Sequence, residues 1–409
     1  MKLPRSRPVR WLIGIVASIL TLVIVAVVWL VFLGGVALTD RGMLWKMIRS
    51  QDGEVPSAEV IAGQLRVPDG YSLSLWARDL PSARLMVPTS AGDLILSQPR
   101  GGLVTLLEAD RDGDGTSDGR RVLFAGLDRP NGVELHEGWL YVAEATRVFR
   151  VRFDPQARAA VGEREVLIDG LSADGGHWRK TARVGPDGML YLGQGSTCNV
   201  CLEKDTRRAT VMRFSLDGSG GSVIASGTRN PYGFDWAPWD GALYATENGR
   251  DLLGDDLPPD ELNRIVEGGF YGWPHVHGRA VVDPEFGPGA EARIATAIAP
   301  AHEFGAHVAP LGIRFLRHDI HSPQFARTAL VALHGSWNRS TPSGYAVVAL
   351  QWDESGRISE RPFLQGFRGE AGLIGRPVDV AEGPEGAIYV SDDYAGVIYR
   401  ITRSPFPSE

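Results

Sequence analysis

The eight residues PDGMLYLG at positions 186–193 contain the pattern that decides the fold. A turn centred on Gly188 leads into a short apolar strand that ends in a small residue, and glycine turns of this kind commonly bound strands. The pattern recurs at residues 91–97, 137–144, 239–246 and 384–391. A single turn-and-strand unit is therefore repeated along the chain.

The spacing of this unit predicts a β-propeller. The glycines at positions 92, 138, 188 and 241 lie 46, 50 and 53 residues apart, and Gly386 follows after 145. That last gap has room for two more units and an insertion, and residues 328–334 supply a weaker strand inside it. Repeats of about 40 to 55 residues are typical of propeller blades, which bury their faces by stacking in a ring. We expect an all-β, six-bladed propeller over residues 64–405, in preference to an array of β-sandwiches.

Composition supports this architecture and limits the partners. The 409 residues include 50 Gly and 26 Pro, which favours strands and tight turns over long helices. The formal net charge is −7 and no long basic run occurs. An acidic domain of this kind is not a nucleic-acid-binding protein.

The N-terminal region predicts a membrane anchor. Residues 11–38 are 28 consecutive positions without a charge, enough to span a bilayer. The basic tail at residues 1–10 and Asp40 on the other side orient the N-terminus toward the cytoplasm. A cleaved signal peptide has a shorter apolar core and a small-residue cleavage site, so an uncleaved anchor is favoured. We expect a single-pass protein of the inner (cytoplasmic) membrane, with a juxtamembrane linker at residues 39–63 and the propeller on the periplasmic side.

Cys198 and Cys201 are the two cysteines of the chain. Export places them in an oxidising compartment, so a disulfide that closes a short loop is the leading interpretation. No His follows Cys201, which argues against haem attachment, and a zinc site would need two more ligands.

The stretch at residues 226–274 carries the strongest chemical signal. Arg229 and Asn230 precede a strand-like segment, and a loop rich in acids and amides follows it. Arginine binds carboxylates in bidentate fashion, and Ca²⁺ takes six to eight oxygen ligands. The combination suits an anionic ligand held beside a hard metal ion, whereas the loop alone would also fit a polar surface turn.

Four segments resemble the glucose/sorbosone dehydrogenase family, and in particular its sorbosone dehydrogenase branch. They are RNPYGFDW at 229–236, DDLPPDELN at 255–263, GGFYGWP at 268–274 and HGSWNR at 334–339. The resemblance extends from about Val67 to Ile401. It implies a six-bladed propeller, pyrroloquinoline quinone (PQQ) and Ca²⁺ as cofactors, and oxidation of a sugar.

The resemblance also implies roles for individual residues. His177 falls at the position of the catalytic base, and Arg229 would stabilise charge on the reduced quinone. Arg84 and Gln194 are substrate-side candidates. The cofactor-binding candidates are Arg229, Asn230, His307, Asn338, Arg339 and Arg376, and the metal candidates are Glu247, Asn248, Gly249, Arg250, Asp260 and Glu261.

The chain departs from the family pattern at three places. Gly176 stands where an acid commonly precedes the catalytic His, which leaves Asp174 as the candidate to orient His177. Val378 replaces a second late arginine, and only Asn338 or Arg339 lies near the position of a lysine contact. These departures fit the sorbosone-type branch as well as an altered cofactor site.

A second metal signal lies at residues 110–118. Oxygen-bearing side chains alternate there, with Gly115 at the sixth position, as in the first half of an EF-hand loop. Arg121 stands where that loop would have a bidentate Glu. A structural Ca²⁺ and a plain acidic turn are both compatible with the set Asp110, Asp112, Asp114, Thr116 and Asp118.

The leading function is therefore a membrane-anchored, exported quinoprotein. It would oxidise a sugar, a sorbosone- or aldose-like sugar aldehyde or a polyol by hydride transfer to PQQ. Electrons would pass to a respiratory quinone or cytochrome. One alternative is a metal-dependent, lactonase-like hydrolase, which residues 129–134 and 141–145 resemble. The other is a propeller that only binds, without catalysis.

Overall fold

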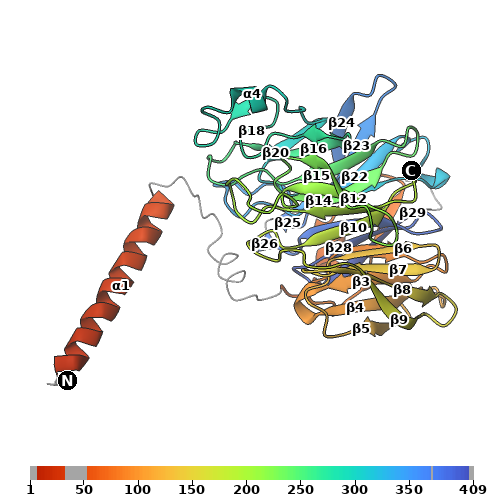
Figure 1. Ribbon diagram of the computed structural model, residues 1–409. Helices are drawn as coiled ribbons and strands as arrows, with labels where there is room; N and C mark the ends of the chain where they lie inside the picture. Colours follow the sequence, from red (N-terminus) through yellow and green to blue (C-terminus); the bar gives the residue numbers. More distant parts are fainter. Residues whose placement is uncertain (1–6, 33–52, 370–371, 405–409) are drawn as a thin grey trace.

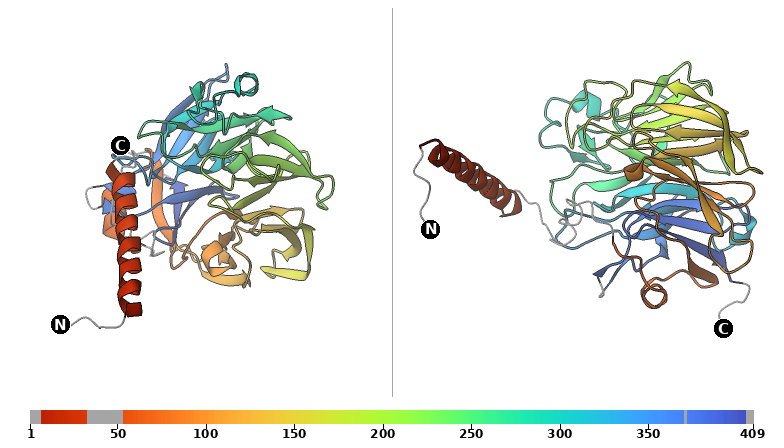
Figure 2. Two further views of the ribbon diagram at one scale, coloured as in Figure 1. Left: turned by 60° about the vertical axis from the view of Figure 1, so that its left-hand side comes forward. Right: turned by 90° about the horizontal axis from the view of Figure 1, so that it is seen from below.

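The computed structural model describes residues 7–32, 53–369 and 372–404. Six antiparallel sheets form its body, and they pack side by side around a shared centre (Figures 1 and 2). The first three blades are β2 (Met86–Pro88), β3 (Leu94–Gln98), β4 (Leu103–Glu108) and β5 (Gly119–Phe124); β6 (Gly132–His136), β7 (Trp139–Ala143), β8 (Val148–Asp154) and β9 (Ala159–Ile168); and β10 (Lys180–Val184), β11 (Leu190–Gln194), β12 (Thr210–Phe214) and β13 (Ser222–Ser226).

The other three blades complete the ring. They are β14 (Pro231–Trp236), β15 (Leu243–Glu247), β16 (Pro259–Ile265) and β20 (His302–Ala306); β21 (Pro310–Phe315), β22 (Thr328–Leu333), β23 (Ala346–Trp352) and β24 (Ile358–Leu364); and β27 (Pro377–Glu382), β28 (Ile388–Asp392), β29 (Val397–Arg403) and β1 (Tyr71–Ala77). The predicted six-bladed propeller is confirmed.

The repeated unit of the sequence is the second strand of each blade. Its glycines at 92, 138, 188, 241 and 386 all have positive φ, between 69° and 83°. Glycine adopts this left-handed conformation without steric cost, which explains its place in the turn between first and second strands. The weaker unit at residues 328–334 supplies β22 of the fifth blade.

The ring closes through both its innermost strands and its ends. The inner strands contact one another in the order β2, β6, β10, β14, β21, β27 and back to β2. The N-terminal strand β1 pairs with β29 as the outer strand of the last blade, so the two ends of the domain share one sheet. This closure leaves no open gap between first and last blades.

Several short elements lie outside the regular blades. The insertion expected from the long spacing lies between β16 and β20 and contains β17 (Gly269–Phe270), β18 (Val276–His277), β19 (Val281–Val282) and α4 (Glu291–Ile294). Of these, β17 pairs in parallel with β13 and adds a fifth strand to the third blade. The remaining ones are η1 (Pro99–Gly101), η2 (Asp319–His321), β25 (Arg368–Gly369) and β26 (Gly372–Leu373).

In the described part of the N-terminal region, two helices precede the propeller. Helix α1 (Arg7–Phe32) stands outside the sheets (Figure 1), and residues 33–38 of the predicted anchor lie outside the described residues. Within the part of the chain that is described, no helix has the length and hydropathy required to cross a membrane. Helix α3 (Ala58–Gln64) belongs to the segment expected to be a linker, and its Ile61 packs into the hydrophobic cluster of the fifth and sixth blades. Residues 39–52 of that segment are outside the described part.

Candidate active site at the centre of the propeller

The predicted site residues meet at one end of the central axis. A predicted site residue lies within the three residues before five of the six inner strands. Arg129 occupies the same place before the sixth, β6. Inner strands of a propeller run in the same sense, so residues at their beginnings converge. Arg84, His177, Arg229, Asn230, His307 and Arg376 are thereby collected from blades that are far apart in sequence.

His177 is held by Ser196, and Asp174 takes no part. Nδ1 of His177 lies 2.9 Å from Oγ and 3.1 Å from the carbonyl oxygen of Ser196. Oγ of Ser196 donates its own hydrogen to the carbonyl of Cys198 at 2.6 Å, so Nδ1 of the imidazole is the donor and Nε2 keeps a lone pair. The prediction that Asp174 orients this ring is wrong, because its exposed carboxylate accepts from Ser172 instead.

The protonation state of His177 follows from its surroundings. Burial, and after it the charge of Arg229, lowers the pKa of the imidazole to about 3. Both effects disfavour the cationic ring. His177 is therefore a neutral imidazole with a free acceptor nitrogen at neutral pH, which is the form a general base requires.

Arg229 is buried, and the protein itself satisfies all five of its donors. Nε donates to the carbonyl of Asn199 at 2.8 Å, and Nη1 donates to the carbonyls of Asn248 and Gly249 at 3.1 and 2.8 Å. Nη2 donates to Oδ1 of Asn199 at 2.9 Å and to a carboxylate oxygen of Asp251 at 3.0 Å. The guanidinium thus already sits in a shell of oxygen atoms that includes one carboxylate.

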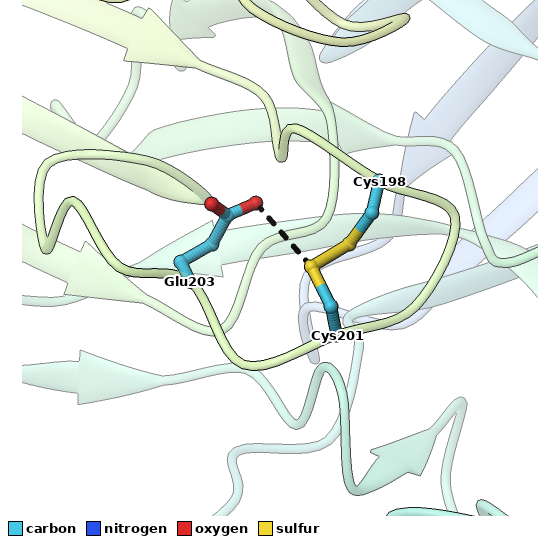
Figure 3. A group of neighbouring side chains, drawn as sticks. All are labelled: Cys198, Cys201 and Glu203. Atoms are coloured by element: carbon cyan, nitrogen blue, oxygen red, sulfur yellow. Dashed lines mark hydrogen bonds between the residues drawn. A yellow bond between two sulfur atoms is a disulfide. The ribbon is translucent and has the colours of Figure 1, made fainter.

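A disulfide-closed loop supports both His177 and Arg229. Cys198 and Cys201 are joined, and the Glu203 carboxylate faces this disulfide, 3.9 Å from Sγ of Cys201 (Figure 3). The loop presents the Cys198 carbonyl to Ser196 and both oxygens of Asn199 to Arg229. A covalent cross-link therefore fixes the acceptors that orient the two residues on which the chemistry would depend.

Close backbone approach brings Asn230 beside His177. A Cβ atom on Gly195 would lie 2.5 Å from Oδ1 of Asn230 and 2.5 Å from Cβ of His177. Only a residue without a side chain fits between them. Nδ2 of Asn230 donates to Oδ1 of Asn248 at 2.8 Å, so the Arg-Asn pair and the following loop form one network.

An acidic loop, residues 251–256, lies over the other cofactor-binding candidates. Asp251 accepts from Arg229 and from Nδ2 of Asn338 at 2.9 Å, and the Gly254 carbonyl lies 2.8 Å from Nε2 of His307. Arg339 donates to the Asp255 carbonyl and, at 3.1 Å, to the Asp256 carboxylate. This loop supplies acceptors to four of the six predicted cofactor residues.

The predicted metal ligands do not converge. Glu247 and Glu261 lie opposite each other on β15 and β16, buried in the fourth blade, and both oxygens of Asp260 accept backbone N–H groups, from Gly249 and Ala309. Burial raises the pKa of Asp260 and of Glu261 to about 7, and burial together with Glu261 raises the pKa of Glu247. The Arg250 side chain is paired with Asp283.

Carbonyl oxygens do gather where the metal was expected. Those of Asn199, Asn248 and Gly249, with the Asp251 carboxylate, surround the guanidinium of Arg229. Carbonyl and carboxylate oxygens are the ligand types that Ca²⁺ prefers. The oxygens that approach one another here are backbone carbonyls and the Asp251 carboxylate.

The predicted substrate residue Gln194 is not available to a ligand, and neither is Val378. Gln194 is buried on β11, where its amide nitrogen lies 3.2 Å from the sulfur of Met212. Val378, at the position of the missing arginine, is fully buried in the core. Arg376, by contrast, lies at the centre and donates to the carbonyls of His334 and Gly335.

A second histidine network went unnoticed in the sequence. Nε2 of His334 lies 2.8 Å from the Asp393 carboxylate, whose other oxygen accepts from Arg84 at 2.6 Å. Arg84 also donates to the hydroxyl of Tyr232, so Arg84 is a member of this network as well as a substrate-side candidate. Burial lowers the pKa of His334 to about 4. His334 begins the motif HGSWNR and so was visible in the sequence, but no sequence spacing indicates that it pairs with Asp393.

The outer acidic loop brings part of its predicted set together. Carboxylates of Asp110, Asp112 and Asp118 lie close enough to share an ion, while Asp114 accepts from Thr116. Asp110 also pairs with Arg400 at 2.9 Å. The loop lies at the outer strands β4 and β5, away from His177.

The hydrolase alternative finds no free acids in its motif. Glu134 is paired with Arg183, and Glu144 is paired with Arg147 and accepts from the amide of Asp128. Asn131 bonds to the hydroxyl of Tyr232. These acids balance arginines rather than offering oxygens to a catalytic ion.

Comparison with known proteins identifies the class. The chain is 24% identical over 428 residues to a PQQ-dependent pyranose dehydrogenase of Coprinopsis cinerea, covering 86% of this chain and 56% of that protein. An uncharacterized protein of Borreliella burgdorferi is 27% identical over 373 residues, covering 84% and 92%. The calcium structure of the Trichoderma reesei AA12 enzyme superposes with a TM-score of 0.73 at 20% identity, covering 83% and 97%.

The PQQ-bound aldose sugar dehydrogenase of Streptomyces coelicolor has a TM-score of 0.59 at 20% identity, over 82% of this chain and 99% of that one. These solved structures share the propeller fold with this chain. A profile of the TrAA12-like family matches residues 65–264 and 290–404, and the chain belongs to that family.

Proposed function

We propose that this protein is a membrane-anchored, PQQ- and Ca²⁺-dependent dehydrogenase of a sugar, a sorbosone- or aldose-like sugar aldehyde or a polyol. One observation carries the proposal. A neutral imidazole with a free Nε2 lies beside an arginine that already holds a carboxylate, at the axis of the propeller. A general base and an anion-binding arginine are the two groups that such an oxidation requires from the protein.

The donor set fits PQQ, which is a planar quinone with three carboxylates. Arg229 and Asn338 hold the Asp251 carboxylate, so they have the geometry to hold a carboxylate of a ligand. Arg229, Asn230, His307, Asn338, Arg339 and Arg376 would hold the cofactor, and carbonyls of Asn248 and Gly249 would face Ca²⁺. When bound, PQQ supplies the acceptor for the hydride.

The residues of the chain would act as follows. Nε2 of His177 accepts the proton of the substrate hydroxyl, and Ser196 keeps the other ring nitrogen protonated throughout. Arg229 contributes a buried positive charge next to the reacting centre, where a low dielectric strengthens its effect. Gly195 keeps the base and Asn230 in contact.

The anchor and the electron acceptor are part of the same proposal. The uncharged run at residues 11–38 supports insertion in the inner membrane, with the propeller in the periplasm. Side chains of helix α1 such as Trp11, Leu20 and Leu22 are exposed apolar groups, which a bilayer would cover. A membrane-bound dehydrogenase on this side can pass electrons to a respiratory quinone or cytochrome. A structural Ca²⁺ in the loop at residues 110–118 completes the proposal.

Calorimetric titration tests the cofactor directly. PQQ is added to the full-length protein in detergent micelles, first with Ca²⁺ and then with a chelator. We expect saturable binding that weakens without Ca²⁺ and reduction of a dye in the presence of sugars. Absence of binding under both conditions would replace the dehydrogenase by a propeller that binds without catalysis.

A further inference from the structure

Arg179 is a cation of the central site whose Nε has no acceptor among the described residues. It directly precedes β10, its Nε is buried, and within the described residues this nitrogen has no hydrogen-bond partner. Its guanidinium carbon lies 4.6 Å from the centroid of the Trp178 ring. Arg84 and Arg376 differ, because a carboxylate and two carbonyls respectively accept from them.

The surroundings of Arg179 add positive charge rather than balance it. Arg129 stacks on the same Trp178 ring, with its guanidinium carbon 4.7 Å from the centroid. Burial, followed by the charge of Arg84, lowers the pKa of Arg179 to about 10. The carboxylate whose charge opposes it, that of Asp393, is already shared between Arg84 and His334. Burying a cation without a partner costs free energy, so binding an anion beside Arg179 would be favourable.

The position of Arg179 relative to the base selects the kind of anion. Arg179 lies two residues after His177 in the segment that directly precedes β10, and it stacks on Trp178, which stands between them in the sequence. The charges of Arg229, Arg208 and Arg179 all act on the imidazole of His177. A molecule with a hydroxyl at His177 and its reacting carbon toward Arg229 therefore has Arg179 within reach of its other substituents.

We propose that Arg179, together with Arg129 and Trp178, binds a carboxylate or phosphate group of the substrate, which is therefore a sugar acid or a sugar phosphate. The inference rests on the dehydrogenase function proposed above and narrows its substrate class. Guanidinium groups bind both anions through paired N–H donors. The anionic group is recognised at a distance from the carbon that is oxidised, so it acts on binding rather than on the chemical step.

The experiment compares four sugars on the full-length protein loaded with PQQ and Ca²⁺. They are D-glucose, D-glucuronate, D-gluconate and D-glucose 6-phosphate, and dye reduction gives kcat and KM for each. We expect KM for at least one anionic sugar to be at least about tenfold below that of glucose. A preference for glucose 6-phosphate identifies a phosphate, and a preference for glucuronate or gluconate a carboxylate.

Variants assign the effect to Arg179. Arg179→Gln is expected to raise KM for the preferred anionic sugar about ten- to a hundredfold, with a smaller change in kcat and in KM for glucose. Arg179→Lys should recover part of the loss. Arg152→Gln is the matched control, since Arg152 is likewise stacked on a tryptophan, Trp139 at 3.9 Å, but lies on β8 outside the site.

Two results would overturn the assignment. Equal KM values for glucose and all anionic sugars would show that no anionic group is recognised. A tenfold loss of PQQ affinity in Arg179→Gln would assign Arg179 to the cofactor instead. Glucuronate, gluconate and glucose 6-phosphate are also titrated into the cofactor-free protein by calorimetry. This titration tests the anion site even if PQQ does not bind. Failure of PQQ to bind, which ends the proposed function, is thereby distinguished from failure of the anion site.

Discussion

Two loops hold Arg229, and they do so by different means. The disulfide loop at residues 197–201 offers the backbone carbonyl and side-chain oxygen of Asn199, and a covalent bond closes it. The acidic loop at residues 251–256 offers the carboxylate of Asp251 and has no cross-link. The first loop reaches His177 as well, through Cys198 and Ser196, whereas the second reaches His307, Asn338 and Arg339.

The two loops therefore differ in their effect on Arg229: one orients its side chain, and the other occupies its donors. Neutral acceptors on a closed loop orient Arg229 without cancelling its charge, and they leave the loop in place whatever binds. A carboxylate on an open loop cancels the charge and takes the donors that an anionic cofactor would use. We therefore interpret the disulfide loop as the scaffold of the site and Asp251 as an internal carboxylate that a ligand would have to displace.

The largest effect is expected from the residue that the scaffold supports. His177→Ala should lower kcat about a hundred- to ten-thousandfold, because it removes the proton acceptor. PQQ affinity, measured by calorimetry, should change little. An unaltered kcat would show that the network from Cys198 through Ser196 to His177 serves packing only.

The next effect tests whether Asp251 competes with the cofactor. Asp251→Asn keeps the size of the side chain and removes its charge, so PQQ should bind about tenfold more tightly in a calorimetric titration. Asp256→Asn is the control, because that carboxylate is exposed and contacts only Arg339. Weaker binding in Asp251→Asn would instead make Asp251 a necessary part of the site.

Opening the disulfide should affect activity more than stability. The Cys198→Ser, Cys201→Ser double variant loses a cross-link across only three residues, so the melting temperature should fall by a few degrees at most. The carbonyl of Cys198 and the oxygens of Asn199 would become mobile, and kcat should fall about three- to tenfold. A large loss of stability with full activity in the remaining folded protein would contradict the assignment as a scaffold for the site.

The smallest effect concerns buried carboxyl groups near the centre. Burial raises the pKa of Asp392 to about 7, so folding favours its protonated form. Its contribution to stability is therefore present below its unfolded pKa of about 3.9 and is lost as the pH rises toward 7. Asp392→Asn should remove this loss and raise the free energy of unfolding at pH 8 by about 1 to 3 kcal/mol relative to its effect at pH 4. Denaturant unfolding at both pH values measures it, and equal effects at the two would contradict the raised pKa.

Prediction from the sequence succeeded where the signal is local. The glycine turns have positive φ between the first and second strands of five blades, and their spacing left room for the remaining unit at β22. Arg229 and Asn230 are adjacent in sequence and precede β14, so their place at the centre followed from the repeat. Cys198 and Cys201 are near enough in sequence for their pairing to be expected.

It failed where contacts depend on how strands pack, within a blade as well as between blades. Ser196 replaced Asp174 as the partner of His177, because the return from β11 passes beside the residues before β10. Gln194 is turned into its own blade, and Glu247 and Glu261 face each other inside the fourth. Asp393 contacts His334 and Arg84 across the junction between blades, and no spacing in the sequence predicts these contacts.

The sequence alone determined the ring of six blades, the acidic and glycine-rich character of the chain and the segments from which a site is built, because turns and strands depend on neighbouring residues. The tertiary structure decided which of the polar residues face one another. Closure of the ring brings together the ends of inner strands up to about 300 residues apart, as in the pair of Arg84 and Asp393 separated by 309. The packing of the blades decides which charges there are paired, shared or left without a partner. On this arrangement rest the proposals that His177 is the base and that Arg179 binds an anion.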